Sequence, residues 1–180
     1  MEMNCFRGIA GKFLEKRKEA KARRKALLDA AKLQHEKWKM DLNSVARMIM
    51  EGDFENADKL IRNLCFSEFE KQHTAKKALV PAMMDGNYGK VREIVKRYEV
   101  DDDTVCDAAI KAYDKVMEMG YYGDAIEISR AFGLVGKERE PAIILIQRYI
   151  RYNDENEARK LADRCNLEKE FKRILANRRS

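Results

Sequence analysis

The sequence predicts an all-α protein: a helical-hairpin solenoid of about four repeats, preceded by a long basic N-terminal helix. A turn that begins with glycine and has an aromatic residue two positions later recurs every 34 residues, at 52–57, 86–91 and 120–125, with a weaker copy at 153–158. A period of this length is typical of stacked helical hairpins. The 180-residue chain has only two prolines and nine glycines, and 38% of its residues are charged. This composition favours helices over strands and loops.

The first predicted element is a basic arm over residues 1–26. Residues 1–40 contain twelve basic and five acidic residues, whereas the other 140 contain 25 basic and 26 acidic ones. A helix over residues 15–26 has no large apolar side chain to bury, so it stays in solvent or binds something acidic. We expect it to bind RNA or a ribonucleoprotein particle by neutralising phosphates. The predicted contacts are Lys12, Lys16, Arg17, Lys18, Lys21, Arg23, Arg24 and Lys25.

Other interpretations of the basic arm stay open from the sequence. DNA or an acidic protein offers the same negative charge, and a simple solvated helix needs no ligand at all. An anionic membrane surface is disfavoured, because Phe13 and Leu14 are the only large apolar residues within the cationic stretch. Sustained insertion into a bilayer surface requires a longer apolar face.

The second predicted element, residues 27–40, is a capping helix. Apolar residues return here at a spacing that places them on one helical face, and Leu42 continues the series. The end of a solenoid otherwise exposes apolar surface, so we expect this segment to cover the first repeat. Trp38 is predicted to anchor the cap rather than to stack on a nucleic-acid base. The apolar residues concerned are Leu27, Leu28, Ala31 and Trp38.

The repeats occupy residues 41–167. Their first helices are predicted at 41–51, 70–85, 104–119 and 141–152, and a basic C-terminal tail follows at 168–180. Ser67 and Glu70 have the spacing of a capping box. Pro81 lies inside the second of these helices and predicts a kink or a late start, because proline lacks the backbone donor. Two columns are apolar in every copy: Leu60, Ile94, Ile128 and Leu161, and Phe66, Val100, Leu134 and Leu167.

This pattern resembles the tetratricopeptide repeat, whose 34-residue hairpins have glycine, then an aromatic residue, then alanine at the turn between helices. The resemblance covers residues 41–167 and is best at Gly52, Phe54 and Ala57 and at the equivalent positions 120, 122 and 125. The column that is small in this family, seven residues before the glycine, is larger here: Val45, Leu79, Tyr113 and Ile146. Larger residues at that column change how closely paired helices approach.

The resemblance implies that the first helices line a concave groove for a protein partner. The asparagines with which peptide-clamping members hold a terminal carboxylate are missing, so an amphipathic helix or an extended peptide is the expected ligand. Methionine suits such an adaptable surface, although the same methionines could instead fill the core. The predicted groove residues are Lys39, Ile49, Met50, Lys76, Met83, Met84, Met117 and Arg151. Acidic residues of the later copies also fall on this face: Asp107, Asp114, Glu118 and Glu140.

No catalytic, metal or cofactor site is predicted. His35 and His73 are the only histidines, and neither has a nucleophile and carboxylate at a diagnostic spacing. The acidic run 101–103 lacks the pattern of a calcium loop, and residues 133–138 lack the spacing of a phosphate loop. The four cysteines form no C-x-x-C pair and are expected to be buried free thiols. They are Cys5, Cys65, Cys106 and Cys165.

The sequence therefore predicts a cytoplasmic, non-enzymatic adaptor or scaffold. It has no run of about 18 apolar residues that would span a membrane and no apolar core of a secretory signal. The groove would bind a protein partner, and the basic arm would dock on RNA or a ribonucleoprotein. The alternative is a structural subunit or assembly chaperone of a protein complex without nucleic-acid contact.

Overall fold

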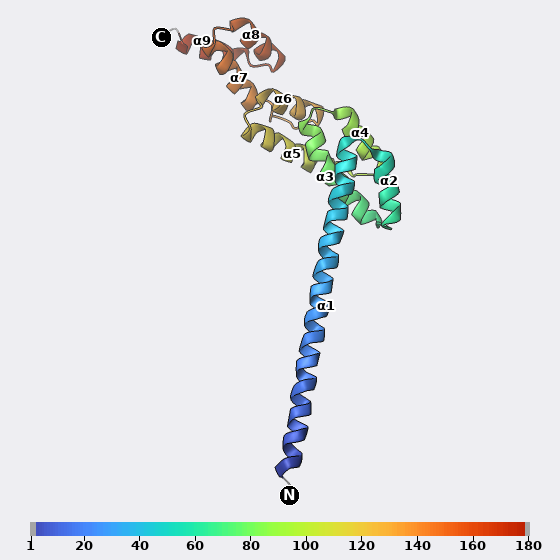
Figure 1. The fold of residues 1–180 in the computed structure, drawn as a ribbon. Helices are drawn as coiled ribbons and strands as arrows, with labels where there is room; N and C mark the ends of the chain where they lie inside the picture. The colour runs from blue at the N-terminus through green and yellow to red at the C-terminus, as the bar shows by residue number, and fades with distance from the viewer. Residues whose placement is uncertain (1–2, 179–180) are drawn as a thin grey trace. The chain divides into compact units, whose positions relative to one another are not determined.

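The computed structural model describes the backbone of residues 3–178 and the side chains of residues 18–178, and all its regular structure in this range is helical (Figure 1). The prediction of an all-α protein is confirmed for these residues. The helices are α1 (Met3–Glu51), α2 (Phe54–Asn63), α3 (Glu68–Met84), α4 (Tyr88–Arg97), α5 (Asp102–Glu118), α6 (Tyr122–Ala131), α7 (Arg139–Arg151), α8 (Glu155–Arg164) and α9 (Glu168–Arg178).

The chain divides into two compact units, Met1–Ser44 and Val45–Ser180. The first unit contains helix α1 up to Ser44, and the last turns of α1 belong to the second unit. The helix is continuous and has no break at residue 26 or residue 40, where domain boundaries were predicted. The side chains from 18 to 40 are exposed, including Leu27 (72%) and Leu33 (74%). The capping role of residues 27–40 stays a prediction.

Within the second unit, the first turn of every hairpin is closed by the same backbone geometry. Residues 52, 86, 120 and 153 all have positive φ angles, of 87°, 67°, 78° and 64°. In the first turn, the amide of Asp53 donates to the carbonyl of Met48 over 2.8 Å, which satisfies a carbonyl left open at the helix end. Three of these four positions are glycine, which adopts a left-handed conformation without strain.

The second helices, α2, α4, α6 and α8, are each ten residues long. Three begin with a side chain that accepts a backbone hydrogen bond: Asp53, Asn87 and Asp154. The equivalent residue before α6 is Tyr121, which makes no such bond. The start points 54, 88, 122 and 155 keep the period seen in the sequence.

The first helices begin with strong caps in two of the hairpins. Ser67 and Glu70 form the predicted capping box at the start of α3, and Asp101 caps α5 by accepting from the amide of Thr104. Pro81 lies inside α3, which starts at Glu68, so the late start expected from this proline is wrong. Pro141 lies in the first turn of α7, where the missing donor costs little.

Helix α7 departs from the repeat. It is 13 residues long, whereas α3 and α5 have 17 residues each. The residue 34 positions after Asp101 is Val135, which is 98% exposed and cannot accept a hydrogen bond through its side chain. The helix begins instead at Arg139, after a second left-handed residue at Gly136. The segment between α6 and α7 is therefore longer than the other connections between helices of the second unit.

The apolar core of the second unit follows the repeat columns. Helix α3 packs against α4 and α5, α6 against α5 and α7, and α7 against α8 and α9. A cluster at the C-terminal end contains Ile126, Ala142, Ile146, Ile150, Ala158, Ala162, Cys165, Leu167 and Phe171. Residues 168–178, which the sequence analysis treated as a basic tail, thus form a helix whose Phe171 belongs to this core.

Candidate functional site

The predicted groove residues separate into core and surface positions. Ile49 and Met83 are fully buried. A side chain without accessible surface cannot contact a partner, so these two residues belong to the core, as the alternative interpretation of the methionines allowed. Met50, Met84 and Met117 are half-buried, and Lys76 and Arg151 are exposed. Lys39 lies in the first unit and pairs with Glu36 of the same helix at 3.1 Å.

Met117 lies in a hollow of about 560 Å³ between α5 and the segment that leads into α7. The hydroxyl of Tyr113 donates to the carbonyl of Lys137 over 2.8 Å and so ties this segment to α5. The ammonium of Lys137 lies 4.7 Å from the centre of the Tyr113 ring and 3.4 Å from a carboxylate oxygen of Asp114. The remaining lining residues are Glu118, Gly136 and Glu140.

The charge of this hollow is negative. Asp114, Glu118 and Glu140 contribute three carboxylates, and Lys137 alone offsets them. Burial raises the pKa of the Tyr113 hydroxyl, and the charges of Glu140 and Asp114 raise it further. Such a site suits a lysine or arginine side chain of a ligand, with Met117 as an apolar contact for the methylene stem.

A second hollow, of about 480 Å³, lies between α7 and α9. Gln147 and Arg151 line it from α7, and Asn177 and Arg178 line it from α9. Arg178 also donates a hydrogen bond to the side chain of Asn153. Both charged residues are arginines, so this hollow favours an acidic group, in contrast to the acidic hollow beside Met117.

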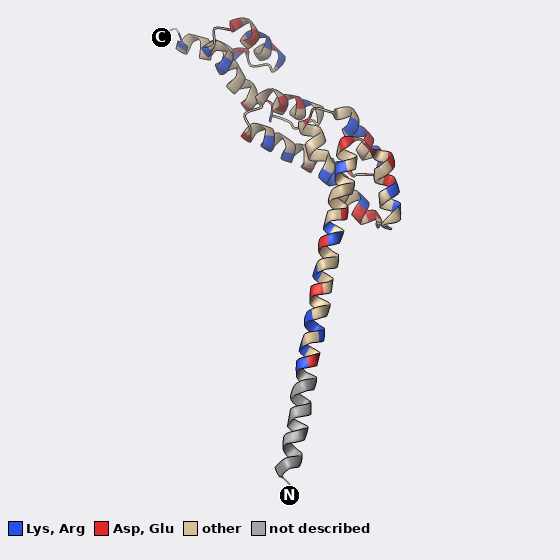
Figure 2. Ribbon diagram, in the orientation of Figure 1, with Lys and Arg blue, Asp and Glu red and all other residues tan. Residues whose placement is uncertain are grey.

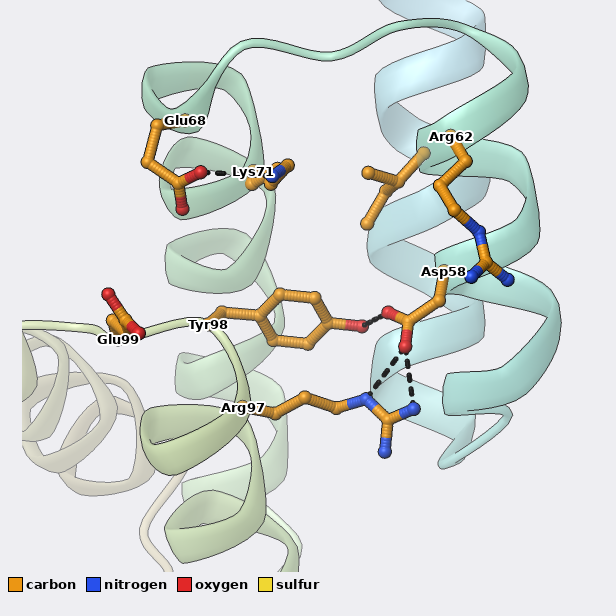
Figure 3. Close-up of a pocket in the computed structure, with 8 residues that line it drawn as sticks. Asp58, Arg62, Glu68, Lys71, Arg97, Tyr98 and Glu99 are labelled. Atoms are coloured by element: carbon orange, nitrogen blue, oxygen red, sulfur yellow. Dashed lines mark hydrogen bonds and ion pairs between the residues drawn. The ribbon is translucent and has the colours of Figure 1, made fainter.

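A third pocket, of about 380 Å³, lies on helices α2, α3 and α4 (Figure 3). Asp58 is its central residue. One of its carboxylate oxygens accepts hydrogen bonds from Arg97 over 3.0 and 2.6 Å, and the other accepts from the Tyr98 hydroxyl over 3.0 Å. The pocket also contains an ion pair between Lys71 and Glu68, at 2.9 Å. Its charges are largely paired, so its main effect is to connect α2 with α4.

Two side chains that bind Asp58, those of Arg97 and Tyr98, have raised pKa values. The hydrogen bond to Asp58 is the main cause of the raised pKa of Arg97. Burial raises the pKa of Tyr98 well above its usual value of 10.0, and the hydrogen bond to Asp58 adds to the shift. The ion pair itself is partly exposed, so its net contribution to stability is less than about 1 kcal/mol. Removing the buried hydroxyl of Tyr98 therefore tests the link between α2 and α4 better than removing the ion pair does.

Replacing Tyr98 with phenylalanine is expected to lower the free energy of unfolding by about 1.5–3 kcal/mol, because one hydrogen bond to a charged acceptor is lost. Above pH 10 the unfolded chain ionises this hydroxyl before the folded chain does, so the stability of the parent protein falls as pH rises. The free energy of unfolding of the variant should fall less between pH 7 and pH 10.5 than that of the parent protein. Urea unfolding at pH 7 and pH 10.5 measures both effects. Tyr121→Phe, at an exposed position, is the matched control, and equal behaviour of the two variants would contradict the prediction.

The described part of the basic arm is an exposed cationic helix. Residues 18–40 contain eight basic and three acidic residues, and Figure 2 shows how these charges follow one another along α1. Among the predicted RNA contacts, Lys18, Lys21, Arg23, Arg24 and Lys25 are exposed. Lys12, Lys16 and Arg17 lie outside the described side chains.

The cysteine prediction holds for one position only. Cys165 is buried, and burial raises the pKa of its thiol, but Cys65 and Cys106 are exposed. Both are free thiols, but the expectation that they would be buried is wrong. Cys5 lies outside the described side chains. Among the side chains of residues 18–178, no three metal-ligating groups come together.

Comparison of the chain with protein-family models, with curated proteins and with solved structures found no match. Within the described residues, no helix has both the length and the apolar composition needed to cross a bilayer.

Proposed function

We propose that this protein is a non-enzymatic adaptor: a solenoid of tetratricopeptide-like hairpins that binds a protein partner, with an N-terminal helix that docks on RNA or a ribonucleoprotein in the cytoplasm. The solenoid is supported by the recurrence of left-handed residues and ten-residue second helices. Contacts between neighbouring repeats support it too. Lys90 donates to the carbonyl of Met50 over 2.7 Å, and Arg130 donates to that of Arg164 over 2.7 Å.

The observation that carries the RNA part is the segregation of charge. The basic residues of the described arm are exposed along a helix, whereas residues 41–180 are almost neutral. Neutralising phosphates releases counterions, so a helix of this kind binds polyanions without needing a base-specific contact.

The groove supports a ligand of mixed charge. Its acidic hollow beside Met117 fits a basic side chain, and its basic hollow beside Arg151 fits an acidic one. An amphipathic helix or an extended peptide that carries both charges would satisfy the two hollows together. This pattern replaces the terminal carboxylate clamp of the repeat family as the proposed mode of recognition.

A second candidate is a structural subunit or assembly chaperone that contacts protein alone. It is favoured by the exposed Leu27 and Leu33, because apolar side chains on a charged helix gain more from a protein surface than from phosphates. Purification of the protein with its bound partners, before and after nuclease treatment, separates the candidates. Partners retained after nuclease, with no nucleic acid in the untreated sample, would favour the structural subunit.

Binding of the full chain to single-stranded polyuridylate over a range of salt concentrations tests the adaptor directly. If the five described contacts each neutralise one phosphate, the logarithm of the association constant should fall with that of the salt concentration with a slope of about −3.5. Absence of binding at low salt, or a slope near zero, would remove RNA from the proposed function.

A further inference from the structure

Helix α1 carries an apolar row at alternating spacings of three and four residues. We call it the α1 seam, and it consists of Leu28, Ala31, His35, Trp38, Leu42, Val45 and Ile49. Alternation of three and four is the spacing at which one helix presents a continuous edge to another helix. The row ends towards the N-terminus at Arg24 and Lys21, which occupy the next two positions of the same series.

The two ends of the α1 seam differ in burial. Val45 and Ile49 are fully buried in the second unit. Leu28 and Trp38, in contrast, are 55% and 38% exposed, and Ala31 and His35 are exposed as well. The His35 and Trp38 rings stack at a centroid distance of 5.8 Å, which orders the exposed part of the row. The same pattern that forms core at one end of the helix is thus open to solvent at the other.

A row of lysines borders the exposed part of the seam. Lys25, Lys32 and Lys39 follow one another at seven-residue intervals, and each comes directly after a seam-register position. All three are exposed. In a coiled coil these are flanking positions, where charges select the partner and its orientation. Lys39 has an ion pair with Glu36 in its own helix, but both side chains are more than half exposed, so a partner's carboxylate can replace it at little cost.

A second copy of the chain fits this lysine row poorly. In a parallel pair the three lysines would face Ala20, Leu27 and Gln34, none of which is acidic. In an antiparallel pair the two lysine rows would face each other, and like charges at flanking positions repel. Self-pairing therefore gains no ion pair in either orientation.

A lipid surface also fits poorly. An interfacial helix needs a broad apolar face with its charges on the other side. Here the apolar row is only two positions wide per seven residues, and Leu33 is exposed on the opposite side of the helix. This narrow width is that of a seam between two helices.

From these observations we infer that the exposed α1 seam docks an amphipathic helix of another protein that carries glutamate or aspartate along the edge facing Lys25, Lys32 and Lys39. The apolar positions of that helix pack on Leu28, Ala31 and Trp38. Lys25, Arg24 and Lys21 are also proposed RNA contacts, so a docked helix that reaches them competes with RNA for these three side chains. This surface is separate from the groove on the first helices of the repeats and does not depend on it.

Trp38 provides a direct readout, because it is the single tryptophan of the chain. The full-length protein is titrated with a synthetic helical peptide, about three heptads long, that has leucine at the seam positions and glutamate at the flanking positions. We expect a saturable shift of the Trp38 emission to shorter wavelength. A control peptide with lysine in place of the glutamates should produce no shift.

Three variants assign the effect to the seam. Leu28→Asn should weaken binding of the acidic peptide by about 10-fold or more, because a large apolar contact is lost. Leu33→Asn, at a more exposed position on the other side of the helix, should leave binding unchanged. A triple exchange of Lys25, Lys32 and Lys39 to glutamate should invert the preference between the two peptides. Circular dichroism checks that each variant remains helical.

Each contrary outcome overturns the inference. If the acidic peptide causes no shift, the seam does not dock an acidic helix. A shift that depends only on the concentration of the protein itself would assign the seam to a second copy. An equal shift with vesicles of phosphatidylserine and phosphatidylcholine would assign it to a lipid surface.

Discussion

Replacing Ile146 with alanine is expected to lower the free energy of unfolding by about 2–5 kcal/mol. Ile146 is fully buried at the centre of the cluster that joins α6, α7, α8 and α9. Its removal loses apolar burial and leaves a cavity that the neighbouring helices fill only in part. Total stabilities of small domains are about 5–15 kcal/mol, so this loss would be a large share of the whole. Thermal and urea unfolding, followed by circular dichroism, measure it.

Val135→Ala is the matched control for this substitution. It also removes methyl groups from a β-branched residue, but Val135 lies in the exposed segment before α7. The change in its free energy of unfolding should stay within about 0.5 kcal/mol. If Ile146→Ala behaved in the same way, the cluster of α6 to α9 would not be a packed core.

Exchange of Lys21, Arg23 and Arg24 for glutamate is expected to weaken binding of single-stranded RNA by about 100-fold near physiological salt. The three side chains are exposed on α1, so the exchange removes three phosphate contacts without touching the core. The salt slope should become shallower by about 2, which is the contribution of three phosphates on a single strand. Fluorescence anisotropy of labelled polyuridylate measures both quantities.

A control for net charge is available in the second unit. Lys96, Lys111 and Lys115 are also exposed, and their exchange for glutamate changes the formal charge by the same amount, from +6 to 0. This variant should keep most of the RNA affinity and nearly all of the salt slope. Equal losses in the two triple variants would mean that overall charge, and not the arm, determines binding.

Much of the fold of the second unit could be predicted from the period of the sequence. The turn between paired helices is marked by glycine at 52, 86 and 120, and the first helices predicted to start at 70, 104 and 141 start at 68, 102 and 139. The start predicted at 41 is wrong, because α1 is already helical from Met3. The second turn of each hairpin is less visible, because its left-handed residue is Cys65, Glu99 or Asn166 as well as Gly133. These residues share no side-chain chemistry. The sequence therefore gives no common signal for this turn, and its position depends on how the flanking helices pack.

Other features depended on exact positions that periodicity does not supply. Val135 stands where Ser67 and Asp101 act as caps, so α7 starts three residues later than strict periodicity would place it; the predicted start at 141 nevertheless lies two residues from the observed start at Arg139. Helix α1 passes through both predicted boundaries, since the alanine-rich and charged residues there contain no helix-breaking signal.

The candidate site was predicted in part. The sequence placed Met117 and Arg151 on the groove face, where each lines a hollow. It also placed Met83 there, but neighbouring residues lie about 100° apart around a helix, and Met83 falls on the buried side of α3 while Met84 is half-buried. Tyr113 and Lys137 line the hollow beside Met117 because the segment before α7 is longer than the other connections, which the sequence pattern did not predict. Arg178 lines the hollow beside Arg151 because α9 is a helix, whereas a tail was predicted there.

The left-handed residues at Cys65 and Glu99 have a consequence for how much change the protein tolerates. An L-residue held at positive φ costs about 1–2 kcal/mol relative to glycine, which has no such penalty. The chain therefore carries two sites where a single exchange would recover stability without touching either hollow or the arm. The stability gained at these two sites could offset the stability lost through a substitution elsewhere. Substitutions in the binding surfaces would then be tolerated more easily.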